Sequence, residues 1–350
     1  MAPTGSTIET ATFERVELRL AETFTIARGS TDTTINHLVT VTDETGRVGV
    51  GAAAPSAYYG ETAESVEAVL PDLCRTVEAV GDPFAQQELE GRLREAAPNE
   101  AAARAAISVA VHDLAARKRG EPLYRQWGLD AERAPTSSYT IGIDTPEEMA
   151  TRARKRREEG YSVLKVKLGT DEDRARLSAI REVVPDARIR VDANCDWESE
   201  TALDNLSWLT DLDVEFLEQP VPADDIAGLR RITEAAPFPI AADESCITAG
   251  DVPAVADAVD IVVVKLMKCG GIRPALRQIE TAYAHGLDVM LGCMVESSAS
   301  IAGACHLSPL VRYADLDGAL LLDADPCDGL VRPGGSIPLS TVEAGTGAHV

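Results

Sequence analysis

The sequence contains little lysine and an excess of acidic residues. Only six of its 33 basic residues are lysine, and 57 acidic residues give the 350-residue chain a formal net charge of −24. A field of that sign repels nucleic acid and anionic membranes, so we predict neither as a partner. No apolar run approaches the roughly 18 residues that span a bilayer, and the N-terminal segment lacks the basic start and apolar run of an export signal. We therefore expect a cytoplasmic protein.

The cysteines lack the spacing of a metal or disulfide motif. The seven cysteines are scattered along the chain, and none forms a CxxC pair. This pattern argues against a zinc site and a disulfide framework, and it is typical of a reducing compartment. We expect free and mostly buried thiols.

From about residue 135 the sequence repeats a regular pattern of short apolar runs and longer amphipathic stretches. The β-branched, apolar runs occupy residues 137–142, 161–169, 187–194, 214–220, 238–245, 259–267, 287–294 and 311–318. The stretches typical of helices include residues 146–160, 172–184, 199–210, 224–235, 251–259 and 271–286. Eight strands with seven or eight intervening helices predict an α/β fold, a modified (β/α)8 TIM barrel of the (β/α)7β type. An open doubly wound sheet is the alternative, but no GxGxxG follows the first of these strands.

The N-terminal part of the chain has a different pattern. Residues 7–20 and 36–54 alternate like antiparallel strands, and helical patterns follow at residues 64–81 and 102–120. We expect an α+β capping domain over residues 1–134 and a catalytic barrel domain over residues 135–320. A tail rich in Gly and Pro, residues 321–350, is expected to fold back and complete the capping domain.

Three acidic residues stand at the C-terminal ends of consecutive predicted strands. They are Asp192 in RVDAN, Glu218 in FLEQP and Asp243 in AADES. These strand ends share one face of a barrel, and neighbouring strands lie ~4.8 Å apart, so the three carboxylates should converge. Carboxylate oxygens clustered in this way suit Mg²⁺. Capping of the following helices would explain any one of them, but the matching positions of all three favour a metal site.

Lysine in an apolar strand is costly, yet four of the six lysines lie in such segments. Lys165 and Lys167 are two residues apart on the second predicted strand and should point to the same side. Lys265 ends the sixth strand, which lies opposite the second in an eight-stranded barrel. Amines on two sides of a metal-bound ligand are what proton removal from one face and return to the other requires. A nearby Mg²⁺, a second lysine and desolvation would each lower the lysine pKa from ~10.4 toward neutrality.

The remaining lysines have a simpler interpretation. Lys118 and Lys155 lie among arginines on predicted helices, and Lys268 follows the sixth strand beside Gly270 and Gly271. We expect all three to be surface lysines whose charged ends reach water.

In this order and spacing, the motifs resemble the muconate-lactonizing subgroup of the enolase superfamily over nearly the whole chain. They are KVK at 165–167, DAN at 192–194, EQP at 218–220, DES at 243–245 and the lysine of the sixth strand. The resemblance implies that Asp192, Glu218 and Asp243 bind Mg²⁺. It also implies that Lys167 and Lys265 are the two acid/base residues and that Lys165 helps to hold the substrate carboxylate. Members of the family abstract an α-proton and stabilise the enediolate through the metal, and many are rings or dimers, so we expect a homo-oligomer.

The choice of substrate depends on ADLDG, in the last predicted strand. Asp315 and Asp317 should face the same way, and two carboxylates at the mouth of the barrel suit a cationic amine. This segment resembles the Asp-x-Asp of the dipeptide epimerases, which binds the free α-ammonium group of the substrate. An acidic surface loop is the alternative explanation for these two residues.

By the same resemblance, parts of both domains line the pocket. FTIARGS (24–30) is similar to the first specificity loop, where Arg28 could pair with a side-chain carboxylate of the second residue of the dipeptide. Thr140 is expected to contact the peptide, and Cys293 and Val295 are expected to surround the reacting residue. We therefore predict an epimerase that acts on a dipeptide similar to L-Ala-L-Glu by a two-base proton transfer with Mg²⁺.

Other readings of the sequence remain open. A cycloisomerase, an o-succinylbenzoate synthase or an N-acylamino acid racemase would use the same fold, but a muconate or succinylbenzoate has no amine for Asp315 and Asp317 to meet. A non-catalytic barrel that binds an acidic ligand or metal would not need to retain three metal ligands and both lysines. A structural protein gives no reason to place lysine in apolar strands.

Overall fold

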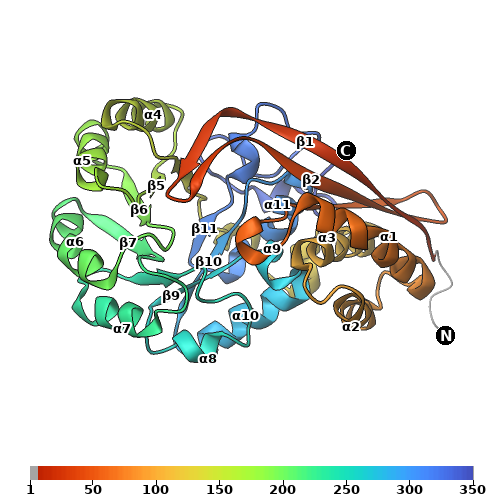
Figure 1. Ribbon diagram of the computed structural model, residues 1–350. Helices are drawn as coiled ribbons and strands as arrows, with labels where there is room; N and C mark the ends of the chain where they lie inside the picture. The colour runs from red at the N-terminus through yellow and green to blue at the C-terminus, as the bar shows by residue number, and fades with distance from the viewer. Residues whose placement is uncertain (1–6, 350) are drawn as a thin grey trace.

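The computed structural model describes residues 7–349 and contains the two kinds of architecture that the sequence predicts. A three-stranded antiparallel sheet and three helices lie beside a parallel, nearly closed eight-stranded barrel (Figure 1). Within the described residues, no helix is both long enough and apolar enough to cross a membrane.

The first two strands form a long hairpin that reaches the barrel. Strands β1 (Ile8–Ile26) and β2 (Gly29–Asp43) pair antiparallel along most of their length, and β3 (Val48–Ala53) adds to the other side of β2. Ile26 pairs with Gly29, so Ala27 and Arg28 form the closed end of the hairpin. Figure 1 shows this end lying against the barrel, and the contacts of Arg28 described below confirm the proximity.

Small residues allow β3 to pack closely on a helix. The helices of this region are α1 (Ala63–Val80), α2 (Gln86–Ala96) and α3 (Ala101–Arg119). A Cβ atom on Gly49 or Gly51 would lie 2.2 Å from the carbonyl oxygen of Ala110 or Ala106 in α3. The glycines of β3 and the alanines of α3 therefore allow the strand and the helix to pack closely. The sequence predicted α1 and α3 but not α2.

The barrel contains every strand that the sequence predicted. In spatial order, neighbouring strands follow the chain without exception: β4 (Tyr139–Ile141), β5 (Val163–Lys167), β6 (Arg188–Asp192), β7 (Val214–Glu218), β8 (Ile240–Ala242), β9 (Ile261–Val264), β10 (Asp288–Gly292) and β11 (Tyr313–Asp315). A bridge between Ser137 and Ala314 brings the two ends of the sheet together. The prediction of a parallel barrel is confirmed, and the open doubly wound sheet is excluded.

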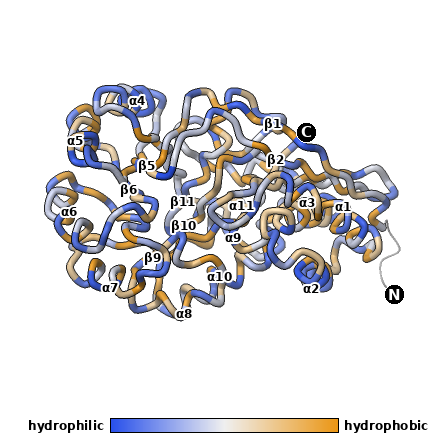
Figure 2. The backbone as a smooth tube through the Cα atoms, in the orientation of Figure 1, coloured by the Kyte–Doolittle hydropathy of each residue, from blue (hydrophilic) through white to orange (hydrophobic). Residues whose placement is uncertain are grey.

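The barrel helices agree with the sequence prediction with three exceptions. Predicted and observed helices correspond for α4 (Pro146–Glu158), α5 (Asp173–Val183), α6 (Ser199–Asp211), α7 (Ile226–Ala235) and α10 (Ile272–Ala284). The helix predicted over 251–259 is only the single turn α8 (Val252–Val255), because the chain turns at 256–259 to enter β9. Helices α9 (Leu266–Cys269) and α11 (Ser298–Cys305) were not predicted. Figure 2 shows helices of mixed hydropathy around the barrel strands.

Aromatic rings and a buried arginine fill the barrel interior. Phe216 and Tyr313 meet edge to face with ring centroids 5.2 Å apart, and the guanidinium of Arg190 lies over both rings. Arg190 also donates from Nε to Glu215 Oε2 at 2.7 Å and from Nη1 to the carbonyl of Ala314 at 2.8 Å. The barrel therefore has a packed interior and not an open pore.

The C-terminal tail contacts the N-terminal region. Leu322 forms a bridge with Leu20, and the Thr346 amide donates to Asp113 Oδ1 at 2.6 Å. Arg117, also in α3, donates to the carbonyl of Ala348 at 2.6 Å. The domain boundaries at residues 134 and 320 stay a prediction.

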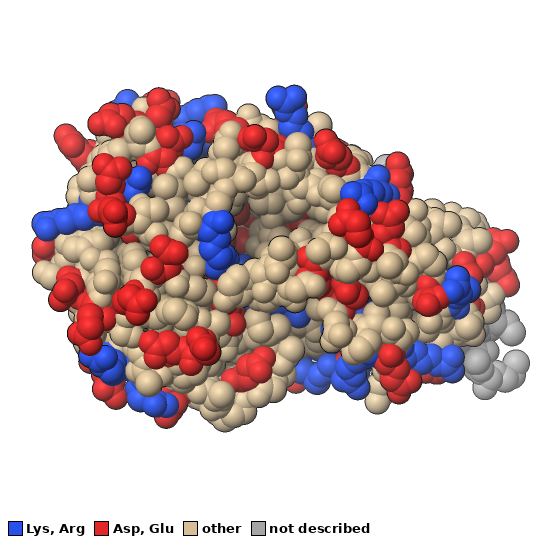
Figure 3. Space-filling view, in the orientation of Figure 1, with Lys and Arg blue, Asp and Glu red and all other residues tan. Residues whose placement is uncertain are grey.

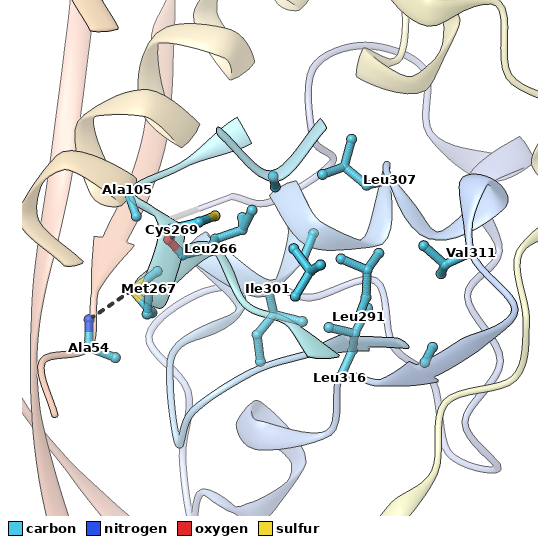
Figure 4. Packing of buried hydrophobic residues seen from close by; sticks show 14 of the residues in the cluster. Ala54, Ala105, Leu266, Met267, Cys269, Leu291, Ile301, Leu307, Val311 and Leu316 are labelled. Carbon is cyan, nitrogen blue, oxygen red and sulfur yellow. Dashed lines mark hydrogen bonds between the residues drawn. The ribbon is translucent and has the colours of Figure 1, made fainter. Parts of the chain in front are cut away.

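Where the two architectures meet, the amide of Ala54 donates to the sulfur of Met267 in α9 at 3.4 Å (Figure 4).

Candidate active site

A cavity of about 500 Å³ lies between the hairpin and the C-terminal ends of the barrel strands. Figure 3 shows the surface hollowed near its centre. The predicted residues that line this cavity are Arg28, Thr140, Lys165, Lys167, Asp243, Lys265, Cys293, Val295, Asp315 and Asp317. Asp192 and Glu218 lie beneath it and contact lysines that line it. The fold therefore gathers all the predicted site residues in one place.

The three predicted metal ligands lie side by side at the ends of adjacent strands. Asp192 and Glu218 are the last residues of β6 and β7 and are paired in the sheet register, and Asp243 directly follows β8. All three are at most 1% exposed. Parallel pairing therefore brings the carboxylates together as the strand-end argument requires.

Two lysines of β5 extend toward these carboxylates. Lys165 Nζ lies 2.7 Å from Glu218 Oε2, 3.2 Å from Asp192 Oδ2 and 2.9 Å from Asp315 Oδ2. Lys167 Nζ donates to Asp192 Oδ2 at 2.7 Å. Alternation along the strand places both ammonium groups on the inner side, as predicted.

Asp243 is held by two further lysines. Lys265, the residue after β9, donates to its Oδ2 at 2.7 Å, and Lys268 donates to its Oδ1 at 2.6 Å. The prediction that Lys268 is a surface lysine is wrong, because this side chain is only 3% exposed. The single turn α9 directs it inward, where it also donates to the carbonyls of Asp243, Val263 and Cys246. The scarcity of lysine in the sequence was the signal that could have revealed it.

Burial and neighbouring charges shift the pKa values of the groups at the centre. Burial and the neighbouring Asp192 raise the pKa of Glu218 to about 8. Burial lowers the pKa of Lys265, but Asp243 outweighs burial and the net change is upward. Burial also lowers the pKa of Lys165, but Asp315 and Glu218 raise it, and the net change is upward. For Lys165 and Lys265, a lowered pKa therefore requires added positive charge near the carboxylates.

The donor set is suited to a hard divalent cation. Three buried carboxylates are the oxygen ligands that Mg²⁺ prefers. Oε2 of Glu218 is held by Lys165, but within residues 7–349 its Oε1 has no hydrogen-bond partner. In the described part of the chain, no group of three or more His, Cys, Asp or Glu is arranged as a ready metal cage. Lysine ammonium groups lie among the carboxylates instead and supply positive charge there. A cation at this place would have to displace them.

The two aspartates of ADLDG have different surroundings. Asp315 is already engaged by Lys165 and accepts from Ser138 Oγ at 2.6 Å. Asp317 accepts from the amide of Thr140 at 2.5 Å and from its hydroxyl at 3.2 Å. Burial and the nearby Asp315 raise the pKa of Asp317 to about 7. Both aspartates are buried, 5% and 2% exposed, so the alternative of an acidic surface loop is wrong.

Arg28 reaches the site from the hairpin and already has protein partners. Its Nη2 lies 2.8 Å from Glu244 Oε1, and its Nη1 donates to the carbonyl of Asn194 at 2.7 Å. The guanidinium lies 4.4 Å from the centre of the Tyr58 ring. Sequence reasoning missed Glu244 and Asn194, although each stands next to or near a predicted ligand, in DES and DAN.

The loop after β10 shapes the wall beside Lys265. A Cβ atom on Gly292 would lie 2.9 Å from Lys265 Cε, so glycine leaves the space through which this side chain passes. Cys293 Sγ accepts from the amide of Gly318 at 3.3 Å, and Val295 lines the cavity. All seven cysteines are free, and Cys195 and Cys293 are the two that are partly exposed.

Comparisons with known proteins agree with this geometry. Residues 7–128 match the model of the mandelate racemase / muconate lactonizing enzyme N-terminal domain, and residues 148–349 match that of the enolase C-terminal domain-like family. The L-Ala-D/L-Glu epimerase of Bacteroides thetaiotaomicron is 39% identical, over 94% of this chain and 85% of its own. A hydrophobic dipeptide epimerase of Roseobacter litoralis is also 39% identical, over 87% and 88% of the two chains. The crystal structure of the dipeptide epimerase of Enterococcus faecalis V583, complexed with Mg and L-Leu-L-Tyr, superposes with a TM-score of 0.92 at 33% identity and covers 98% of this chain and 99% of its own.

Proposed function

Because the chain belongs to the mandelate racemase / muconate lactonizing enzyme family of the enolase superfamily, we propose that it is an isomerase that epimerises dipeptides. One observation carries the proposal: lysines from opposite strands of the barrel, β5 and β9, reach one cavity whose base is formed by three carboxylates. The names of the curated relatives support the reaction class.

The proposed chemistry is a proton transfer between two faces of one carbon. A neutral amine at Lys167 or Lys265 removes the α-proton, and the ammonium of the other lysine returns a proton to the opposite face. Lys165 holds the substrate carboxylate. The net reaction inverts the configuration of the α-carbon and changes nothing else.

Asp192, Glu218 and Asp243 are the residues that would hold Mg²⁺. When bound, the cation supplies positive charge that stabilises the negative charge developing on the substrate carboxylate as the α-proton leaves. Beside that positive charge, Lys265 would have a lower pKa than its present pairing with Asp243 gives it. The free amine that proton removal requires would then form nearer to neutral pH.

A dipeptide explains the acidic end of the cavity. Asp317 is buried, has only Thr140 as its hydrogen-bond partner among the described residues, and lies next to Asp315. A free α-ammonium group would compensate the charge of Asp317, whereas an N-acylated amino acid or a muconate would leave it unpaired. This observation favours the dipeptide over the other substrates of the subgroup.

The second residue of the dipeptide would meet the hairpin. We propose that Arg28 exchanges Glu244 for a side-chain carboxylate, as in an L-Ala-L-Glu-like substrate. Thr140, Cys293 and Val295 would bound the remaining space. The homo-oligomer and the cytoplasmic location stay predictions.

The test is α-proton exchange in D₂O with Mg²⁺. Dipeptides with acidic, apolar and basic second residues are incubated with the protein, and deuterium uptake is followed by mass spectrometry. N-succinylamino acids and muconate are tested in parallel. Uptake confined to dipeptides supports the proposal, and the most rapidly exchanged dipeptide identifies the substrate. Uptake or turnover confined to the N-acylated compounds or muconate would reject the dipeptide.

A further inference from the structure

A second cavity, of about 410 Å³, lies away from the candidate active site, where α2 and α3 meet α10. Among the described residues, it shares no lining residue with the first cavity. Its size falls within the ~300–1,000 Å³ typical of small-molecule sites.

Positive charge is concentrated at this cavity in a strongly acidic protein. Arg94, Arg104, Arg273 and Arg277 all line it, and Glu90 is the one lining carboxylate in the described part of the chain. Glu90 accepts from Arg273 Nε at 3.2 Å and from Arg277 Nη1 at 3.0 Å, so it is shared between two of the four. Figure 3 shows Lys and Arg side chains along the lower edge, between α10 and α2. The cavity therefore retains a local excess of positive charge.

Arg104 contributes a guanidinium that is held by backbone carbonyls. It donates from Nη1 to the backbone carbonyls of Ala97 and Pro98, and within residues 7–349 no carboxylate lies at ion-pair distance from it. Burial lowers the pKa of this guanidinium, against the opposing influence of Glu61. Arg94, which points to the same cavity from α2, also has no ion-pair partner among the described residues.

The opposite wall of the cavity is apolar. Leu89 and Leu93 from α2 and Ile107 and Val111 from α3 supply it, each at most 3% exposed. A ligand that matches both walls must combine an anionic group with an apolar body. Inorganic ions alone would leave the apolar wall uncovered.

From this arrangement we propose that the cavity between α2, α3 and α10 is a second ligand site, which binds a small organic anion, a carboxylate or a phosphate, through Arg94 and Arg104. The site lies next to segments that follow active-site residues. Thr248 and Gly250, in the loop after Asp243, line it on one side, and Cys269 and Gly270, just after Lys265, line it on another. The ligand would therefore contact the segment that follows Asp243 and the segment that follows Lys265.

Calorimetric titration of the full-length protein at constant ionic strength tests the site. The probes are phenyl phosphate, phenylacetate and uncharged benzyl alcohol, which share an aromatic ring and differ in the charged group. We expect one-to-one binding of at least one of the two anions, and benzyl alcohol at least about tenfold weaker, because it cannot pair with a guanidinium. The stronger of the two anions identifies the ligand as a phosphate or a carboxylate.

Matched variants locate the binding. Arg94→Gln removes an exposed guanidinium without an ion-pair partner among the described residues, so it should fold normally and weaken binding about tenfold. Arg104→Gln should weaken it at least as much. Arg92→Ala, on the same helix but paired with Glu88 outside the cavity, is the control and should leave the affinity unchanged. Lys165→Ala should also leave it unchanged, which separates this site from the active site.

Three results would overturn the proposal. The first is that neither anion binds at millimolar concentration. The second is that Arg92→Ala weakens binding as much as Arg94→Gln, which would indicate diffuse surface charge. The third is a loss of oligomer mass in light scattering of Arg94→Gln, which would show that the cavity belongs to a subunit interface.

Discussion

Lys268 Nζ lies 2.6 Å from Asp243 Oδ1, and neither side chain is more than 3% exposed. The same ammonium group donates to three backbone carbonyls, including that of Asp243 itself. Lys268 therefore fixes both the carboxylate and the backbone of a predicted metal ligand. Its hydrogen bond to the carbonyl of Cys246 also connects α9 to the loop that follows β8.

Replacement of Lys268 by methionine should destabilise the protein strongly. The change leaves buried acceptors without their donor and removes one of the two charges paired with Asp243. We expect the free energy of unfolding to fall by about 3 kcal/mol, measured by urea denaturation. Lys155→Met, at an exposed position of α4, is the matched control and should change it little. Equal stability of the two variants would show that Lys268 is not a structural anchor.

Replacement of Lys265 by alanine should stop proton transfer at one face of the α-carbon and leave it at the other. If Lys265 serves one face only, racemisation should stop while α-proton exchange persists from a single stereoisomer through Lys167. The expected loss of racemisation is at least about 10³-fold. Exchange is measured by mass spectrometry with each diastereomer supplied separately. Exchange that survives equally from both diastereomers would remove Lys265 from its assigned role.

Replacement of Asp317 by asparagine should act on dipeptides selectively. Asparagine keeps an oxygen acceptor for the Thr140 amide but removes the charge that would meet the substrate ammonium. We expect kcat/KM for the dipeptide to fall by about 30-fold or more, since a buried charge pair is lost. An N-acetylated dipeptide serves as the comparison substrate. If both substrates lose the same factor, Asp317 does not recognise an amine.

The strand-end argument predicted the centre of the site because parallel register leaves little freedom. Asp192 and Glu218 end their strands and Asp243 directly follows its strand, so once the strands pair, the three carboxylates must adjoin. The partners of Arg28 and Lys268 were not predictable in this way. Arg28 meets Glu244 only because the hairpin docks on the barrel, and Lys268 turns inward only because α9 is a single turn. Contacts between distant segments depend on docking, which local sequence patterns do not specify.

Glu61 should make stability depend on pH. Burial raises its pKa to about 7 from the usual 4.5, although its Oε1 accepts from the Ala102 amide at 2.9 Å. The folded state thus holds this proton more tightly than the unfolded state, and stability falls as pH rises from about 4.5 to about 7.

Glu61→Gln keeps the acceptor and removes the titration. We expect the variant to be more stable than the wild type at pH 8, by at most about 3 kcal/mol, and of similar stability at pH 4. Thermal or urea unfolding across this range measures the difference, with the exposed Glu14→Gln as control. A gain that does not depend on pH would exclude ionisation of Glu61 as the cause.

The glycine beside Lys265 provides a test of how finely that lysine is positioned. In Gly292→Ala the new Cβ would lie 2.9 Å from Lys265 Cε and 3.2 Å from Val263 Cγ1, so the lysine stem must move. Because a displacement of about 1 Å can cost two orders of magnitude in rate, we expect kcat to fall by about 10²-fold. The cost in stability should stay within about 1–3 kcal/mol, because only one methyl group is added. Gly91→Ala in α2 is the control, since no heavy atom of the described residues would crowd its Cβ, and it should raise the free energy of unfolding by about 0.5–1 kcal/mol without affecting kcat. Unchanged kcat in Gly292→Ala would mean that Lys265 need not follow the path seen here in order to transfer its proton.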